Sequence, residues 1–355
     1  MGEFAPGLEG VIAVETEIAE PDRDGGALRY RGVDIRDLVG VVPFERVWGL
    51  LVDGVADACL NLDDVVPLPA STGVVLADLQ AATASLAGHW DLGKLLDIDP
   101  STARRDLERV SAAIVDIVAR IAGDDAAAAG IVGSTGSLAE RFLSAWRGAA
   151  RPREVQALDT YWICTAEHGL NASTFTARVV ASTGADCAAC LAAAIGALSG
   201  PLHGGAPARI LPMLDAASAA NSMAGYVRGE LDAGERLMGF GHRVYRAEDP
   251  RARLLRETAR QIGAPRLTVA EAFESAALGE LRRRKPDRVL ATNVEYWSAV
   301  VLDAARVPAD LAPALFACSR TAGWSAHILE QQRTGRLIRP GARYVGPPTA
   351  TLSAA

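Results

Sequence analysis

The 355-residue sequence has a net charge of -7; half of its residues are hydrophobic and 22% are charged. This composition is typical of a globular protein with a sizeable core, built as one large domain or two ordinary ones. The negative charge gives no reason to expect nucleic-acid binding. We expect no transmembrane helix, because the sequence has no run of 18 apolar residues. We expect no signal peptide, because no basic region followed by an apolar run is seen at the N-terminus.

Alanine-rich segments with a helical spacing of apolar residues dominate the chain. Helices are predicted over residues 76–86, 107–121, 137–146, 155–180 and 311–332. Strand-like alternation is rare: it occurs over residues 11–17, and after a turn at residues 22–26 the chain could return as a second strand over residues 28–30. Residues 337–345 read as another extended piece. The fold class is therefore predicted to be all-α, with small β hairpins at the edges.

Two loops rich in Gly and Pro, residues 199–207 and 238–250, divide the chain, and a helix is predicted after each. The second loop ends in a clear helix start, with Asp249 as N-cap and Pro250 at the first helical position. The segment 206–305 could therefore form a smaller lobe on a larger body.

Later helix boundaries are also marked by local chemistry. A helix is predicted from Asn293 to Ala305, Pro308 then breaks the chain, and the long helix that follows ends near Gly335. The basic run at residues 282–285 is interpreted as a solvated helix end rather than a binding patch.

The five cysteines are an odd, scattered set, which favours a reducing compartment, so a cytoplasmic protein is expected. Cys187 and Cys190 form a CxxC pair inside an alanine-rich helical run, with no second pair elsewhere. Core packing is the favoured interpretation. Because the sequence has no HExxH motif and no Cys/His cluster, no metal site is predicted.

His168 and Asn171 are three residues apart, so they would share a face if this segment is helical. They are either part of a site or a satisfied polar pair in the core. His89 and His327 lack such surroundings and are interpreted as structural. The chain has no P-loop, no GxGxxG after a strand and no nucleophile elbow, which disfavours nucleotide hydrolysis and dinucleotide redox chemistry.

His203 lies in the segment Gly-Pro-Leu-His-Gly-Gly-Ala at residues 200–206. Proline restricts the backbone here, while glycine permits positive φ and the close approach of a ligand. A helix predicted just afterwards would point free N–H groups at His203, which suits a neutral histidine that donates a hydrogen bond. A structural turn with a half-buried histidine explains the same residues equally well.

His242 lies in a glycine-rich loop that also carries Arg243, Arg246 and Arg251, immediately before and at the start of the capped helix. Guanidinium groups bind carboxylates bidentately, and a helix N-terminus favours negative charge. The loop is therefore a candidate anion site, the alternative being a surface turn with solvated arginines.

Taken together and in this order, these motifs resemble the citrate synthase family. The matching segments are residues 7–11, 30–35, 167–173, 200–206, 239–251, 293–295, 320–324 and 339–344. The resemblance implies a helical homodimer whose subunit closes over its substrates. In that case residues 1–205 and 306–355 form the large domain and residues 206–305 the small one.

The resemblance also implies the reaction and the residues that perform it. His203 would hydrogen-bond the thioester oxygen of acetyl-CoA, Glu295 would remove the methyl proton, and His242 would bond the oxaloacetate carbonyl and supply a proton. Water would then hydrolyse citryl-CoA. Oxaloacetate would be bound by His168, Arg251, Arg320 and the neighbouring subunit's Arg339. Asn171 would support the His168 region. Arg246 would contact the phosphates of CoA, and Asn293 its pantetheine side. No metal, permanent cofactor, nucleic acid or membrane is expected.

Glu295 departs from the family pattern, which usually has Asp in the segment Asn-Val-Asp. Glu keeps the carboxylate but adds one methylene, and a displacement of about 1 Å can cost on the order of 100-fold in rate. Three interpretations stay open: a working citrate synthase, a slower or altered paralogue such as a 2-methylcitrate synthase using propionyl-CoA, and a ligand-binding paralogue without activity. A pure interaction module is a fourth, and it would not need the histidines and arginines to converge.

Overall fold

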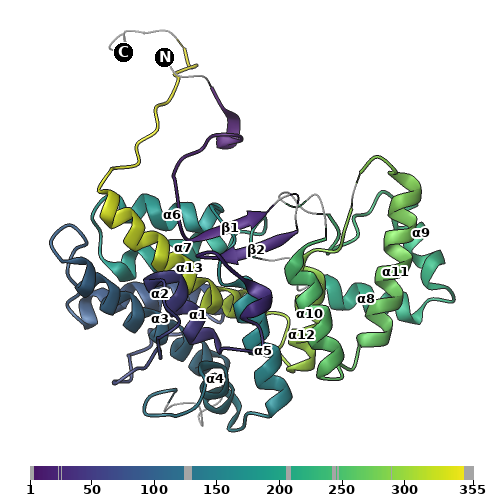
Figure 1. Cartoon of the computed structure of the whole chain (residues 1–355), viewed down its shortest axis with the longest axis horizontal. Helices are drawn as coiled ribbons and strands as arrows, with labels where there is room; N and C mark the ends of the chain where they lie inside the picture. Colours follow the sequence, from purple (N-terminus) through teal and green to yellow (C-terminus); the bar gives the residue numbers. More distant parts are fainter. Residues whose placement is uncertain are drawn as a thin grey trace, which may run out of the picture.

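The computed structural model describes residues 4–22, 24, 26–123, 130–204, 209–241, 245, 248–288 and 290–347. These ranges contain thirteen α-helices and one three-stranded sheet (Figure 1), which confirms the predicted all-α class with a small β element. None of the helices in the described ranges has the length and apolar character that crossing a membrane requires.

The helices are listed here in chain order. They are α1 (Phe44–Asp53), α2 (Val75–His89), α3 (Pro100–Ala122), α4 (Leu138–Arg147), α5 (Pro152–Thr165), α6 (Ala172–Ala181), α7 (Cys187–Leu198), α8 (Ile210–Ala219), α9 (Met223–Asp232), α10 (Pro250–Gln261), α11 (Leu267–Arg284), α12 (Val294–Ala304) and α13 (Ala312–Thr334). The strands are β1 (Ala19–Asp22), β2 (Ala27–Tyr30) and β3 (Val33–Asp34).

The small sheet is antiparallel, with Ala19 of β1 opposite Tyr30 of β2, and β2 paired in turn with β3. The strand predicted over residues 28–30 is therefore confirmed. The strand predicted over residues 11–17 is wrong: this segment pairs with no other described segment, the side chain of Ile12 is exposed, and β1 begins only at Ala19. Residues 337–345 likewise pair with no strand among the described residues.

The core centres on α13, which packs against α1, α3, α5, α6 and α7. Its buried residues occupy every face of the helix, so it carries no amphipathic stripe. Cys187 and Cys190 are fully buried in α7 with free thiols, which confirms their interpretation as core residues.

A second group of helices lies beside this body and appears in green in Figure 1. Within it, α10 packs against α12, and α11 packs against α8 and α9, while α10 and α12 also contact α5. The helix predicted directly after His203 begins only at Ile210, and residues 205–208 are outside the described ranges.

The helix boundaries marked by capping chemistry are confirmed. The Asp249 side chain accepts a hydrogen bond from the Arg251 N–H, with Pro250 at the first position of α10. Asn293 caps α12, and Gly335 ends α13 with a left-handed φ of 64°. Each residue satisfies or terminates a helix end that would otherwise leave polar backbone groups unpaired.

The single helix predicted over residues 155–180 is wrong, because the chain breaks between α5 and α6. Gly169 adopts a φ of 69°, which L side chains rarely tolerate, and Asn171 caps α6 by accepting from the Thr174 N–H. The apolar pattern continues through the break because both flanking helices bury the same core.

Candidate active site

His168 lies in the loop between α5 and α6, so it shares no helix face with Asn171. The Asn171 side chain is satisfied locally, its Nδ2 donating to Gly169 O at 3.2 Å and its Oδ1 accepting from the α6 backbone. His168 is half-buried, and its Nε2 lies 3.0 Å from the Tyr245 hydroxyl, with the two rings edge to face. The break between the helices thus presents His168 toward the loop that precedes α10.

His203 is half-buried, and its Nε2 lies 2.8 Å from Ser173 Oγ in the first turn of α6. Trp324 of α13 donates its indole N–H to the same hydroxyl at 3.2 Å. Burial, and secondarily the nearby Arg320, lowers the pKa of His203 from 6.5 to about 4. A neutral histidine was expected from the sequence, but its cause is desolvation and a buried cation rather than a helix N-terminus.

Arg320 of α13 is a guanidinium enclosed in the core, with 2% of the residue exposed. Its Nε donates to Thr165 O at 2.9 Å, and its plane lies over the Phe316 ring. Burial lowers its pKa, and the Glu167 carboxylate opposes this shift. The two Nη atoms have no hydrogen-bond partner among the described residues, which leaves a buried cation able to bind an anion.

Arg251 is also buried, and it forms a bidentate pair with Asp249 at 2.9 and 2.8 Å. The same carboxylate accepts the Val294 N–H at 3.1 Å. Asp249 therefore ties the N-terminus of α10, where it is the cap, to the N-terminus of α12. Burial alone lowers the pKa of Arg251, but the Asp249 carboxylate outweighs burial and raises it.

Glu295 occupies the first turn of α12 and is partly buried. Burial raises the pKa of its carboxyl group; Arg251 opposes this shift and Asp249 adds to it. Its backbone N–H donates to Asn293 Oδ1 at 3.1 Å. A carboxylate placed this way is a stronger base than one in water.

Asn293 fastens the glycine-rich loop to α12. Its Nδ2 donates to Gly241 O at 3.0 Å and its backbone N–H to Gly239 O at 2.9 Å. Gly239 has a φ of 86°, and a Cβ there would lie 2.7 Å from the Tyr296 Cβ. The loop therefore needs glycine to pack against α12 at this point.

Arg339 contributes no contact to this region among the described residues. Arg339 is exposed on the C-terminal tail, which leaves the body in Figure 1. His242 and Arg246 lie outside the described residues.

The remaining groups share one electrostatic neighbourhood. Arg320 acts on His203, and Arg251 acts on both Arg320 and Glu295. His168 joins them through Tyr245, whose ring lies 6.0 Å from the Arg251 guanidinium carbon. A pure interaction module would not need this convergence, whereas a site for a small dianion would.

Sequence reasoning missed Ser173, Trp324 and Tyr245 as supports of these groups. Their signal is three-dimensional, because Ser173 contacts a histidine 30 residues away and an indole 151 residues away. Within the described ranges, no three His, Cys, Asp or Glu side chains are grouped in a way that could hold a metal ion.

Gly323 allows α13 to approach the segment that carries His168. A Cβ at this position would lie 2.0 Å from Glu167 Oε2 and 2.7 Å from Ala166 O. Gly323→Ala should therefore lower the free energy of unfolding by about 1–3 kcal/mol, although alanine favours helix. Urea denaturation measures this change, and Gly279→Ala on α11 is the control. A Cβ at Gly279 would have no atom within 4 Å, so Gly279→Ala should leave the free energy of unfolding unchanged or raise it by up to about 1 kcal/mol. Equal stability of the two variants would contradict the tight contact.

Comparison with known proteins gives matches along nearly the whole chain. A family model described as "Citrate synthase, C-terminal domain" matches residues 7–341. A Mycobacterium tuberculosis protein, named only provisionally as citrate synthase 2, is 59% identical over 97% of this chain and 93% of its own length. The citrate synthase of Haloferax volcanii is 36% identical over 97% of this chain and 96% of its own length.

Solved structures show the same similarity. The citrate synthase of Thermoplasma acidophilum, solved in a ternary complex with carboxymethyl coenzyme A and oxaloacetate, superposes with a TM-score of 0.84. It is 26% identical, and the match covers 100% of this chain and 99% of that one.

Proposed function

This chain belongs to the citrate synthase family, and from that premise we propose that it condenses acetyl-CoA with oxaloacetate and water to give citrate and CoA. One observation carries the proposal: a neutral histidine and a carboxylate of raised pKa, His203 and Glu295, lie around two buried arginines. Their chemistry matches the removal of a carbon-bound proton next to a thioester.

The methyl proton of a thioester is a poor acid, so a base alone removes it slowly. Glu295 takes the proton while His203 donates a hydrogen bond to the thioester oxygen, where negative charge develops. This requires the ring proton of His203 on Nδ1. Ser173 Oγ accepts from Trp324 and lies near two acceptors, Asn171 Oδ1 at 2.9 Å and His203 Nε2 at 2.8 Å. The proposal requires that its single proton be donated to Nε2, because donation to Asn171 would leave Nε2 to carry the ring proton.

The enol carbon then attacks the keto carbon of oxaloacetate, and His242 donates a proton to the oxygen that becomes the citrate hydroxyl. Arg320, Arg251 and His168 bind the oxaloacetate carboxylates, with Arg320 offering its two Nη groups, which have no hydrogen-bond partner within the described part of the chain. Asn171 holds the loop that bears His168. Water finally cleaves the thioester C–S bond of citryl-CoA and releases CoA.

Closure and assembly complete the proposed site. The small domain, residues 206–305, closes on the large domain formed by residues 1–205 and 306–355, which excludes water from the enol. In a homodimer, the exposed Arg339 reaches the oxaloacetate of the neighbouring subunit. Arg246 meets the CoA phosphates, and Asn293 faces the pantetheine from the loop that it holds.

A second candidate function rests on Glu295. Its side chain is one methylene longer than the aspartate of the family pattern, so a different acyl group could suit it better. Propionyl-CoA would then be the substrate and 2-methylcitrate the product. One methylene changes discrimination by about 1–3 kcal/mol, so the two substrates must be compared directly.

CoA release, followed with a thiol reagent, tests the proposal. With oxaloacetate present, acetyl-CoA is expected to give the higher kcat/KM, and propionyl-CoA turnover about 10-fold or more lower. Faster turnover of propionyl-CoA would replace the proposal with the second candidate. Absence of release with both would identify a ligand-binding paralogue.

A further inference from the structure

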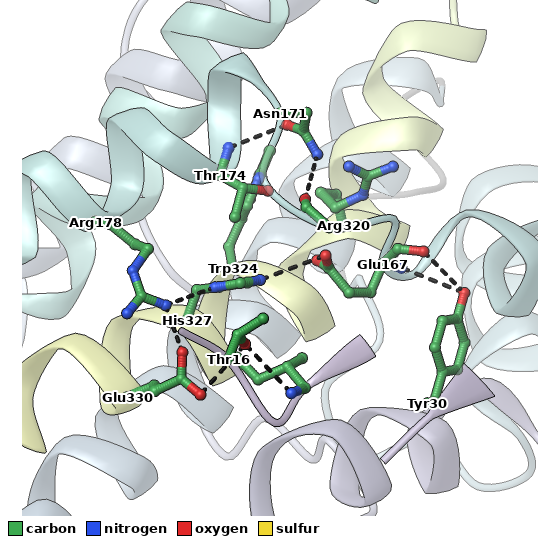
Figure 2. Close-up of polar contacts among 12 residues, drawn as sticks. Thr16, Tyr30, Glu167, Asn171, Thr174, Arg178, Arg320, Trp324, His327 and Glu330 are labelled. Carbon is green, nitrogen blue, oxygen red and sulfur yellow. Dashed lines mark hydrogen bonds and ion pairs between the residues drawn. The ribbon is translucent and has the colours of Figure 1, made fainter. Parts of the chain in front are cut away.

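Four buried polar side chains link α6, α13 and the segment before His168. We call them the α13 polar network: Glu167, Arg178, His327 and Glu330, each at most 6% exposed. Figure 2 shows Arg178 between His327 and Glu330, at 2.7 and 2.6 Å, and His327 reaching on to Glu167. So much buried charge is unfavourable unless each group is paired, so the network is tightly specified.

The network fixes the tautomer of His327. A guanidinium can only donate hydrogen bonds, so Nδ1 of His327 must accept from Arg178. The ring proton is therefore on Nε2, which faces Glu167 Oε1 at 3.4 Å. His327 thus presents a fixed donor to a buried carboxylate.

Glu167 is held on its other sides as well. Its backbone N–H and C=O both pair with the Tyr30 hydroxyl, at 3.3 and 3.2 Å. Its Oε2 has no hydrogen-bond partner among the described residues, while its charge acts on Arg320. Glu167 directly precedes His168 and its charge acts on Arg320, so it connects the network to two proposed oxaloacetate ligands.

Arg178 adds a second restraint. It lies on α6, whose first turn carries Ser173, and its pair with Glu330 fastens this helix to α13. Glu330 Oε1 also accepts from the Glu17 N–H and the Thr16 hydroxyl. The network therefore sets the mutual placement of the segments that carry His168 and Arg320.

We propose that His327 is a positioning residue for oxaloacetate, which through its Nε2–H to Glu167 fixes the placement of His168 and Arg320. This inference rests on the proposed function. It assigns His327 a role in affinity for the dianion, beyond the structural role expected from sequence. Small displacements of such ligands are costly, on the order of 100-fold for about 1 Å.

Two polar variants of His327 separate this role from simple packing. His327→Gln can place an amide donor near Glu167, whereas His327→Asn can accept from Arg178 but is too short to reach Glu167. Oxaloacetate affinity measured by calorimetry should fall about 10-fold or more in His327→Asn and by less than about threefold in His327→Gln. The KM for acetyl-CoA at saturating oxaloacetate should stay within about twofold in both.

Gln332→Leu is the matched control on α13. Gln332 donates to Leu95 O and Ile98 O, so its loss should lower the melting temperature without changing oxaloacetate affinity. The positioning role would be overturned if the two His327 variants bound oxaloacetate with equal affinity, or if Gln332→Leu lost as much affinity for oxaloacetate as His327→Asn. Either result would leave the proposed function standing. Wild-type protein that fails to bind oxaloacetate would overturn the proposed function, and with it this inference.

Discussion

Glu295→Gln should lower kcat for CoA release by about three orders of magnitude, because the amide cannot accept the methyl proton. The KM for oxaloacetate should change little, since the substitution preserves shape. Steady-state kinetics with saturating oxaloacetate measures both constants. Turnover close to wild type would remove Glu295 as the base.

The raised pKa of Glu295 gives this prediction a pH dependence. The base must be ionised, so kcat/KM of the wild type should fall as pH decreases through the raised pKa. Folding favours the protonated carboxyl, so above that pKa its ionisation opposes folding. Glu295→Gln should therefore be at least as stable as the wild type at neutral pH, which separates lost catalysis from lost structure.

Glu295→Asp is the informative companion variant. It restores the family's aspartate but withdraws the carboxylate by one methylene. If the surrounding loop is adjusted to glutamate, this variant should lose about 10- to 100-fold in kcat. A gain in kcat would mean that the longer side chain is a handicap for acetyl-CoA.

His203→Ala should lower kcat by about 100- to 1000-fold, because the developing charge on the thioester oxygen loses its donor. Ser173→Ala should lower it by a smaller factor, since the histidine remains but its tautomer is no longer set. The same assay measures both. A larger effect from Ser173→Ala than from His203→Ala would contradict this division of roles.

The lowered pKa of His203 should make the folded chain less stable at acidic pH. Its pKa is about 4 in the folded chain against an ordinary value of 6.5. Between these values the unfolded chain binds the proton more readily, so stability is lost as pH falls from about 6.5 to 4. His203→Ala should remove that part of the pH dependence in urea denaturation.

Local chemistry predicted much of this fold. Asp249 with Pro250, Asn293 and Gly335 each mark a helix end through their own side chain or φ, and the structure places the ends there. The break at Gly169 was missed because apolar periodicity continues across it. Gly169 and the N-cap Asn171 are local signals of this break, but apolar periodicity alone does not distinguish a long helix from two helices that bury the same core.

The sequence offers a set of candidate site residues but not their arrangement. Motifs indicated His203, Arg251 and Arg320, whereas their supports come from distant parts of the chain. The contact of Ser173 with His203 depends on how α6 meets the loop after α7. His327 lacks the motif surroundings of the other candidate histidines, so its sequence indicates only a structural role. Such contacts are set by tertiary packing, which no local pattern encodes.

The hydrogen bonds of Asp249 limit how the substrate preference of this chain could change during evolution. Because one carboxylate caps α10, pairs with Arg251 and accepts the first N–H of α12, it couples the position of the proposed base Glu295 to that of the Arg251 guanidinium. A shift of α12 that suits a longer base would therefore also displace Arg251, the proposed oxaloacetate ligand. An evolving lineage must therefore accommodate the extra methylene of Glu295 on the acyl side, in the residues that surround the thioester.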